Sequence, residues 1–218
     1  MRFFLSLSAV LFAFFAGSYG FAQELEKVLA ARPAAELVKR IRAEGNSSNG
    51  AILFHQPHLA CIKCHSVSGS PEGKPGPELT KLGPEVTAQH IVESILAPSK
   101  SIRKGFESLQ VQLHDGRTIA GLIVKDSPEI IELRDADGRV VLIKAAEIEE
   151  RKPVANSLMP AGLVNLLATE SQFFDLARYL LEVHEGGVKR ALELQPPAAL
   201  LVLKTPEYEP YRSRGVDS

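Results

Sequence analysis

The pentapeptide Cys61-Ile62-Lys63-Cys64-His65 decides how the rest of the chain is interpreted. Two thiols three positions apart can each add to one of the two vinyl groups along one edge of a porphyrin. The histidine that follows the second thiol can then supply its imidazole to the iron. This spacing is the attachment signal for a c-type haem. We therefore expect Cys61, Cys64 and His65 to hold one covalent haem c, with His65 as an iron ligand.

Other chemistries of two cysteines at this spacing explain the pentapeptide less well. A redox-active disulfide loop of the thioredoxin kind leaves His65 without a role and lacks the strand-and-helix context of that motif. A structural zinc site needs four ligands, and no second Cys/His pair follows at a suitable spacing. The alternative is an apo structural or thiol-redox module. It would be favoured if Cys61 and Cys64 were found without haem.

The N-terminus predicts export. A basic residue, a short apolar run and the small residues Gly20 and Ala22 are typical of a secretory signal peptide over residues 1–22, cleaved after Ala22. An uncleaved anchor is the alternative, but the apolar run is short for a membrane span. We expect a periplasmic or otherwise exported protein of bacterial type, with no membrane span after cleavage. A net charge of −1 over 218 residues gives no indication of nucleic-acid binding.

The period of the apolar residues changes along the chain from helical to alternating and back. A helical lead-in is expected over residues 23–45, and a helix from Thr87 to Ala97 carries His90 on a solvent-exposed side. Four alternating strands with Asp-Gly turns predict a β subdomain over residues 106–149. A short helix is expected at 51–54, and loops are expected at 66–79 and 150–158. The last helix should run from Thr169 to Gly186-Gly187. A mostly extended, Pro-containing C-terminal tail is expected at 187–218.

Met159 is the one methionine that remains after cleavage at Ala22. It lies in a loop with Pro160 and Gly162, just before the last helix, and not in an apolar stripe. A core methionine is the usual interpretation of such a residue, but this position favours a thioether ligand on the iron face opposite His65. A proximal histidine also needs a partner for its other ring nitrogen, and a backbone carbonyl of the loop at 66–79 is expected to provide it.

The order of these motifs over residues 45–185 resembles a class I cytochrome c. More closely, it resembles the haem-binding domain of planctomycete and verrucomicrobial secreted proteins, which has a β insertion between its histidine and methionine ligands. The residues that carry the resemblance are Cys61-x-x-Cys64-His65, Gly76-Pro77-Glu78-Leu79 and Ser157-Leu158-Met159-Pro160-Ala161-Gly162-Leu163.

The resemblance implies an α+β chain. Its cytochrome c domain, residues 46–186, would be an α-helical cytochrome c fold with an inserted antiparallel β meander or small barrel between the two axial ligands. It further implies His65 and Met159 as the axial ligands of the haem iron, and Pro77 as the residue whose carbonyl orients His65. The alternative for Pro77 is that the prolines of its loop serve to stiffen a surface segment.

These expectations point to an electron carrier and not to an enzyme. With His65 and Met159 both bound, the iron has no open position, so single electrons are exchanged with a redox partner protein. In the resembling family the domain often follows a sugar-dehydrogenase-like propeller, so we expect a separate sugar or alcohol dehydrogenase, or an oxidase, as partner. Attachment of haem requires the cytochrome c maturation machinery. The alternative is a haem enzyme or a gas or peroxide sensor in which Met159 dissociates, although the sequence places none of His55, His58 and His114 beside the iron.

Overall fold

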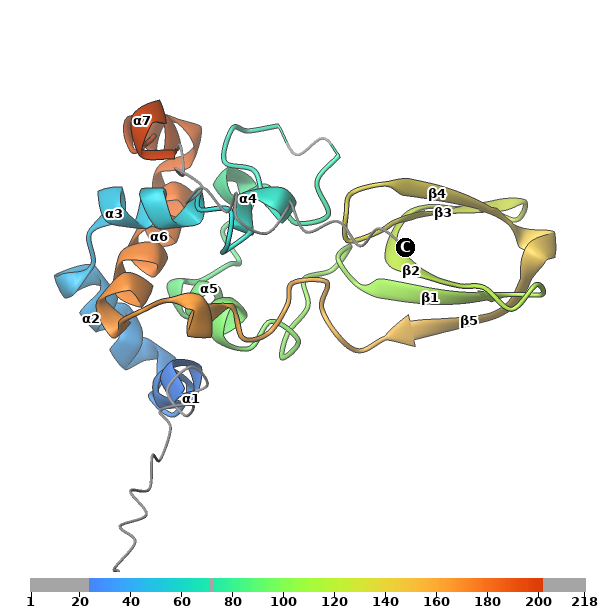
Figure 1. The fold of residues 1–218 in the computed structure, drawn as a ribbon, viewed down its shortest axis with the longest axis horizontal. Helices are drawn as coiled ribbons and strands as arrows, with labels where there is room; N and C mark the ends of the chain where they lie inside the picture. The colour runs from blue at the N-terminus through green and yellow to red at the C-terminus, as the bar shows by residue number, and fades with distance from the viewer. Residues whose placement is uncertain (1–23, 71–72, 202–218) are drawn as a thin grey trace, which may run out of the picture.

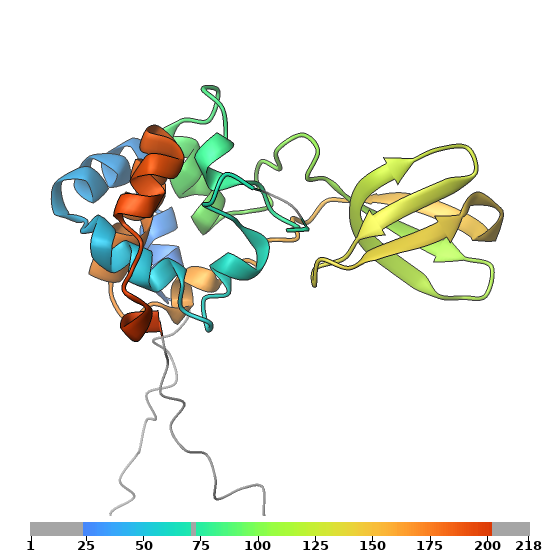
Figure 2. The same ribbon diagram turned by 90° about the horizontal axis from the view of Figure 1, so that it is seen from above.

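The computed structural model describes residues 24–70 and 73–201 as an α+β fold. Figure 1 shows a helical part and a β part that lie side by side, joined by two connecting segments, and Figure 2 shows the same arrangement from above. The expected signal peptide at 1–22 and the end of the expected tail, from residue 202, lie outside the described residues. In the described part, no helix is long and apolar enough to cross a membrane.

The helical part contains the first five helices of the chain and the last two. Pro33 separates the first two helices, and Thr87 caps the fifth by accepting a hydrogen bond from His90 N at 3.2 Å. The helices are α1 (Glu24–Ala30), α2 (Ala34–Glu44), α3 (Ser47–Phe54), α4 (Cys61–Cys64), α5 (Ala88–Leu96), α6 (Glu170–Glu193) and α7 (Ala198–Leu201), with short 3₁₀ turns at Leu79–Lys81 and Leu163–Leu166.

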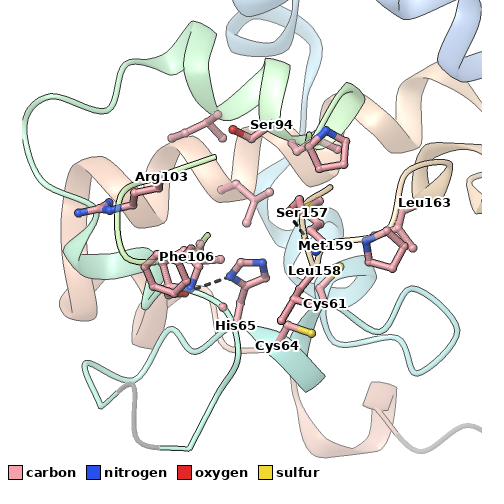
Figure 3. Close-up of a pocket in the computed structure, with 18 of the residues that line it drawn as sticks. Cys61, Cys64, His65, Ser94, Arg103, Phe106, Ser157, Leu158, Met159 and Leu163 are labelled. Carbon is pink, nitrogen blue, oxygen red and sulfur yellow. Dashed lines mark hydrogen bonds between the residues drawn. The ribbon is translucent and has the colours of Figure 1, made fainter. Parts of the chain in front are cut away.

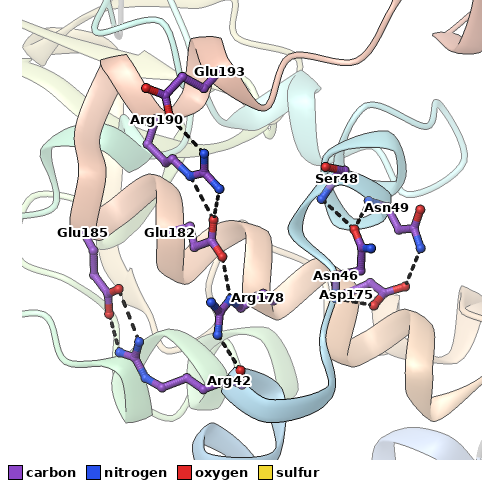
Figure 4. Close-up of polar contacts among 10 residues, drawn as sticks. All are labelled: Arg42, Asn46, Ser48, Asn49, Asp175, Arg178, Glu182, Glu185, Arg190 and Glu193. Atoms are coloured by element: carbon purple, nitrogen blue, oxygen red, sulfur yellow. Dashed lines mark hydrogen bonds and ion pairs between the residues drawn. The ribbon is translucent and has the colours of Figure 1, made fainter.

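Helix α3 begins earlier than the sequence suggests. The sequence predicts a short helix at 51–54, but the helix begins at Ser47 because Asn46 caps it. The Asn46 side chain accepts hydrogen bonds from Ser48 N at 3.0 Å and Asn49 N at 3.1 Å. The buried carboxylate of Asp175, on α6, accepts a hydrogen bond from Asn46 N at 2.7 Å (Figure 4). The cap therefore fixes both the start of α3 and its position on α6.

Helix α6 does not end at Gly186-Gly187, and the expected extended tail is wrong for the residues that follow. The helix continues to Glu193 across a kink at Gly187, whose φ of 61° and ψ of −155° are accessible chiefly to glycine. Glu182 accepts hydrogen bonds from Arg178 at 2.5 Å and from Arg190 at 2.6 Å, and so links the two sides of the kink (Figure 4). The kink brings Val188 against Gly69, in the loop that follows the pentapeptide.

The β part is one antiparallel sheet of five strands in the order β4-β3-β2-β1-β5. Strands β1 to β4 form the expected meander, and Val111, Leu113, Ile131, Leu133 and Ile143 form its own small core. The strands are β1 (Ser108–Leu113), β2 (Thr118–Asp126), β3 (Ile130–Arg134), β4 (Val140–Lys144) and β5 (Ile148–Val154).

The fifth strand corrects the sequence prediction, which placed the end of the β subdomain at residue 149 and a loop at 150–158. Strand β5 pairs with β1 from Ser108↔Val154 to Leu113↔Ile148. Its sequence, Ile-Glu-Glu-Arg-Lys-Pro-Val, has no apolar alternation because it lies at the edge of the sheet and its side chains are mostly exposed. An edge position tolerates both charges and Pro153, so hydrophobic periodicity gives no signal for such a strand.

Close contact between α3 and α6 generates a first prediction. A Cβ atom at the buried Gly50 would lie 1.9 Å from Asp175 O and 2.7 Å from Tyr179 Cβ. Gly50→Ala gains about 1 kcal/mol of helix propensity, but it must push two helix backbones apart. We expect a net loss of about 2 kcal/mol in the free energy of unfolding, measured by urea denaturation. The exposed Ser48→Ala on the same helix is the control and should change stability by less than about 0.5 kcal/mol. Equal stability of Gly50→Ala and the wild type would contradict this packing.

Candidate functional site

The two cysteines of the pentapeptide lie on one short helix. Ala60 adopts a left-handed conformation with φ of 57° and turns the chain from the buried Leu59 into α4. Cys61 and Cys64, three positions apart, lie on the same side of this turn of helix. Both thiols are free, so the pair does not form a disulfide. The single turn thus presents two unpaired thiols beside the histidine that ends it.

His65 is held by the loop that follows it. Its Nδ1 donates a hydrogen bond to Pro77 O at 3.0 Å, drawn as a dashed line in Figure 3, and Gly76 N donates one to Cys64 O at 2.9 Å. The bond to Pro77 places the ring proton on Nδ1 and leaves the lone pair of Nε2 free. Burial lowers the pKa of His65, so the imidazole is neutral at pH 7, which is the form that binds a metal.

Gly76 is needed where the loop passes the imidazole ring. A Cβ atom at this position would lie 2.8 Å from His65 Cε1 and 2.9 Å from both His65 Nδ1 and Cys64 O. The loop therefore packs its bare backbone against one edge of the ring. A second contact between the same segments is a hydrogen bond from Lys74 Nζ to Ile62 O. Residues 74–77 of this loop are thus a fixed support for the pentapeptide.

A cavity of about 360 Å³ opens beside the pentapeptide, within the size range of small-molecule and cofactor sites. All five residues expected at the site, Cys61, Cys64, His65, Pro77 and Met159, line this one cavity. Its other walls are mainly aliphatic and aromatic, and Figure 3 shows side chains from several elements that point into it. The apolar lining includes Phe54, Leu59, Leu79, Leu82, Ile91, Ile95, Leu158, Leu163, Val164 and Leu176.

Met159 reaches the cavity from a loop that is held by one hydrogen bond within the loop and one to Ser99. Met159 N donates a hydrogen bond to Ser157 Oγ at 3.1 Å, and Ser157 N donates one to Ser99 Oγ, also at 3.1 Å. Ser99 lies just beyond the end of α5, so the methionine loop is tied to that helix. The structure thereby brings Met159 to the same cavity as His65, although the whole β part separates the two residues in sequence.

Several lining residues were not found by sequence reasoning. His90 was expected to be exposed, but it is half-buried and lines the cavity together with Ser94, one turn further along α5. Arg103 and Phe106 come from the segment that joins α5 to β1. These residues belong to no local motif, and only the folded chain brings them together.

The β part also contributes to the cavity. Leu122, from β2, and Ala136, from the turn after β3, are among the lining residues. Arg134 Nη1 donates a hydrogen bond to Lys74 O at 3.4 Å, and a Cβ atom at Gly138 would lie 2.8 Å from Gly73 O. The β insertion therefore packs against the loop that supports His65.

Burial controls the ionisation of the thiols. It raises the pKa of Cys61 to about 11 and also raises that of Cys64, for which nearby Lys74 and Lys63 act in the opposite direction. Both thiols are therefore protonated at pH 7, whereas catalytic thiol-redox cysteines have lowered pKa values. Among residues 24–70 and 73–201, no group of three or more His, Cys, Asp or Glu side chains could hold a metal ion.

The raised thiol pKa values predict slow alkylation of reduced, cofactor-free protein at pH 7. The rate should rise about tenfold per pH unit up to pH 9, because only the thiolate reacts. Cys64 should react before the more buried Cys61. Residue-resolved mass spectrometry after iodoacetamide treatment measures both rates, and the urea-unfolded chain is the control. Rapid modification of either thiol at pH 7 would instead favour the thiol-redox alternative.

The chain was compared with protein-family models and with curated proteins. No protein-family model matches the chain, and no match is found among curated proteins either.

Proposed function

We propose that this chain is an exported c-type cytochrome of the class I kind, which carries single electrons through one covalently bound haem c. Cys61 and Cys64 would attach the haem, and His65 and Met159 would be the axial ligands of its iron. The single observation that carries the proposal is that both thiols, the oriented imidazole and the thioether line one apolar cavity.

The residues present fit such a group. His65 is neutral, and its Nδ1 is engaged by Pro77 O, so Nε2 is the nitrogen available for iron. This is the arrangement that a metal-bound histidine requires of its surroundings, because the second hydrogen bond fixes both tautomer and ring orientation. The cavity also offers an apolar volume beside two free, protonated thiols.

When bound, haem c would supply a one-electron Fe(II)/Fe(III) couple. The residues of the chain would control access of small ligands to the iron and the reduction potential of this couple. Met159 would close the second axial position, so that small ligands are excluded. The apolar walls would exclude water and disfavour the more highly charged oxidised state, which raises the reduction potential. Pro77 and Gly76 would keep the imidazole from rotating.

The biological setting follows from the same proposal. Covalent attachment would depend on export through the signal at residues 1–22 and on the cytochrome c maturation machinery. The electron donor or acceptor would be a separate protein, with sugar or alcohol dehydrogenases and oxidases as candidates. Such redox partners meet through small, transient interfaces.

A second candidate function gains one observation from the structure. His90 and Ser94 line the cavity, and Figure 3 shows Ser94 across it from His65. The Ser94 hydroxyl donates its hydrogen bond to His90 O at 2.8 Å. A haem enzyme or a gas or peroxide sensor, in which Met159 dissociates, would need a polar group near the vacated position. His90 is a polar group in the otherwise largely apolar lining of the cavity.

The proposal predicts covalent haem and a thioether ligand. Protein exported together with the maturation machinery should keep haem on a denaturing gel, and Cys61→Ser/Cys64→Ser should lose it. Met159→Ala should abolish the sulfur-to-iron charge-transfer band and lower the midpoint potential, because the thioether favours Fe(II). Leu158→Ala, the neighbouring cavity residue, is the matched control and should keep the band. Absence of covalent haem from the wild type would refute the proposal.

Carbon monoxide separates the two candidate functions. In an electron carrier, the reduced wild type should not bind CO at low concentration, and Met159→Ala should bind it. In a sensor or enzyme, the wild type should bind CO readily, and His90→Ala should change the CO dissociation rate. Absorption spectroscopy of CO titrations and of CO release measures both properties.

A further inference from the structure

Arg103 occupies a defined place in the wall of the cavity. It lies on the segment between α5 and β1, and its side chain is about one-third exposed, at 32%. Its Nη1 donates a hydrogen bond to Leu82 O at 2.5 Å, and its Nη2 lies 3.3 Å from Glu85 Oε1. A guanidinium has five N–H donors in a planar fork. These two contacts therefore leave donors available.

The position of Arg103 relative to the thiols is informative. Figure 3 shows Arg103 on one side of His65, and Cys61 and Cys64 on the other. Lys63 is the other described lining residue with a permanent positive charge, but it lies between the two cysteines in sequence and is exposed. The cavity thus has one cation at the end with the thiols and another at the end away from them.

The chemistry of haem makes this polarity meaningful. The vinyl groups that react with cysteine thiols lie along one edge of the porphyrin, and two propionate carboxylates lie along the opposite edge. Attachment at Cys61 and Cys64 would therefore direct the propionates toward the end of the cavity that Arg103 lines. A carboxylate beside an apolar wall is costly unless it is paired. Arginine is the side chain best suited to pair with it, because its fork matches the two oxygens.

We propose that Arg103 binds a haem propionate and sets the orientation of the carboxylate edge of the cofactor. This inference rests on the proposed function, since it requires haem c in the cavity. Arg103 acts as a positioning residue, and its guanidinium is held by Leu82 O and Glu85. The same cation would also neutralise the propionate and so favour Fe(II).

The test compares Arg103→Gln with Lys104→Gln in the haem-loaded protein. Both variants remove one positive charge from the same segment, but Lys104 is exposed and is not among the residues that line the cavity. In Arg103→Gln, the propionate bending band in the resonance Raman spectrum should shift. The midpoint potential should also fall by up to ~59 mV. For one electron, this corresponds to a change of about tenfold in the redox equilibrium constant. Lys104→Gln should leave the band in place and shift the potential less.

Equal effects of the two variants, or an unshifted band in Arg103→Gln, would overturn the inference while leaving the proposed function intact. Absence of covalent haem from the wild type would instead refute the proposed function. If Arg103→Gln does not fold, Arg103→Lys becomes the decisive variant, because it keeps the charge and removes the fork. A shifted propionate band in Arg103→Lys supports the inference, and an unchanged band overturns it.

Discussion

The hydrogen bond from His65 Nδ1 to Pro77 O is the contact on which the site depends. It fixes the tautomer and the rotation of the imidazole, and it joins the pentapeptide to a loop that is itself held by Gly76 N and Lys74. Without it, the imidazole could rotate, and Nε2 would not be held in one direction within the cavity that His65 shares with Met159. Close approach of the loop backbone is possible because Gly76 has no side chain to meet the ring.

The helical frame supports this contact through its own close approaches. Gly50 lets α3 lie directly on the backbone of α6, and the kink at Gly187 turns the end of α6 toward the loop at Gly69. The pair of Glu182 with Arg190 spans that kink, and Glu182 is also paired with Arg178, which lies before it (Figure 4). Because both arginines are partly exposed, each of these ion pairs adds little stability. They act mainly by favouring one direction of the helix after the glycines.

Local sequence signals predict the local structure well and the cavity poorly. Helix α5 and strands β1 to β4 follow from periodicity and capping, and the pentapeptide identifies Cys61, Cys64 and His65 without any fold. Strand β5 could not be predicted because none of its side chains is buried, so it shows no apolar pattern. The burial of His90 and the position of Arg103 could not be predicted either. Both depend on which segments, distant in sequence, form the opposite walls of the cavity. No local sequence pattern determines which segments these are.

The pairing of Ser108 with Val154 affects the entropic cost of bringing His65 and Met159 to one cavity. His65 and Met159 are far apart along the chain, and joining the ends of a long flexible loop costs conformational entropy that grows with the logarithm of its length. The sheet has its own small core, and its first and last strands are neighbours, so its two ends emerge about one strand spacing apart, roughly 5 Å. Once the sheet has formed, the effective loop between His65 and Met159 consists of residues 66–107 and 155–158 alone. The insertion therefore adds many residues between His65 and Met159 at little entropic cost to bringing them together.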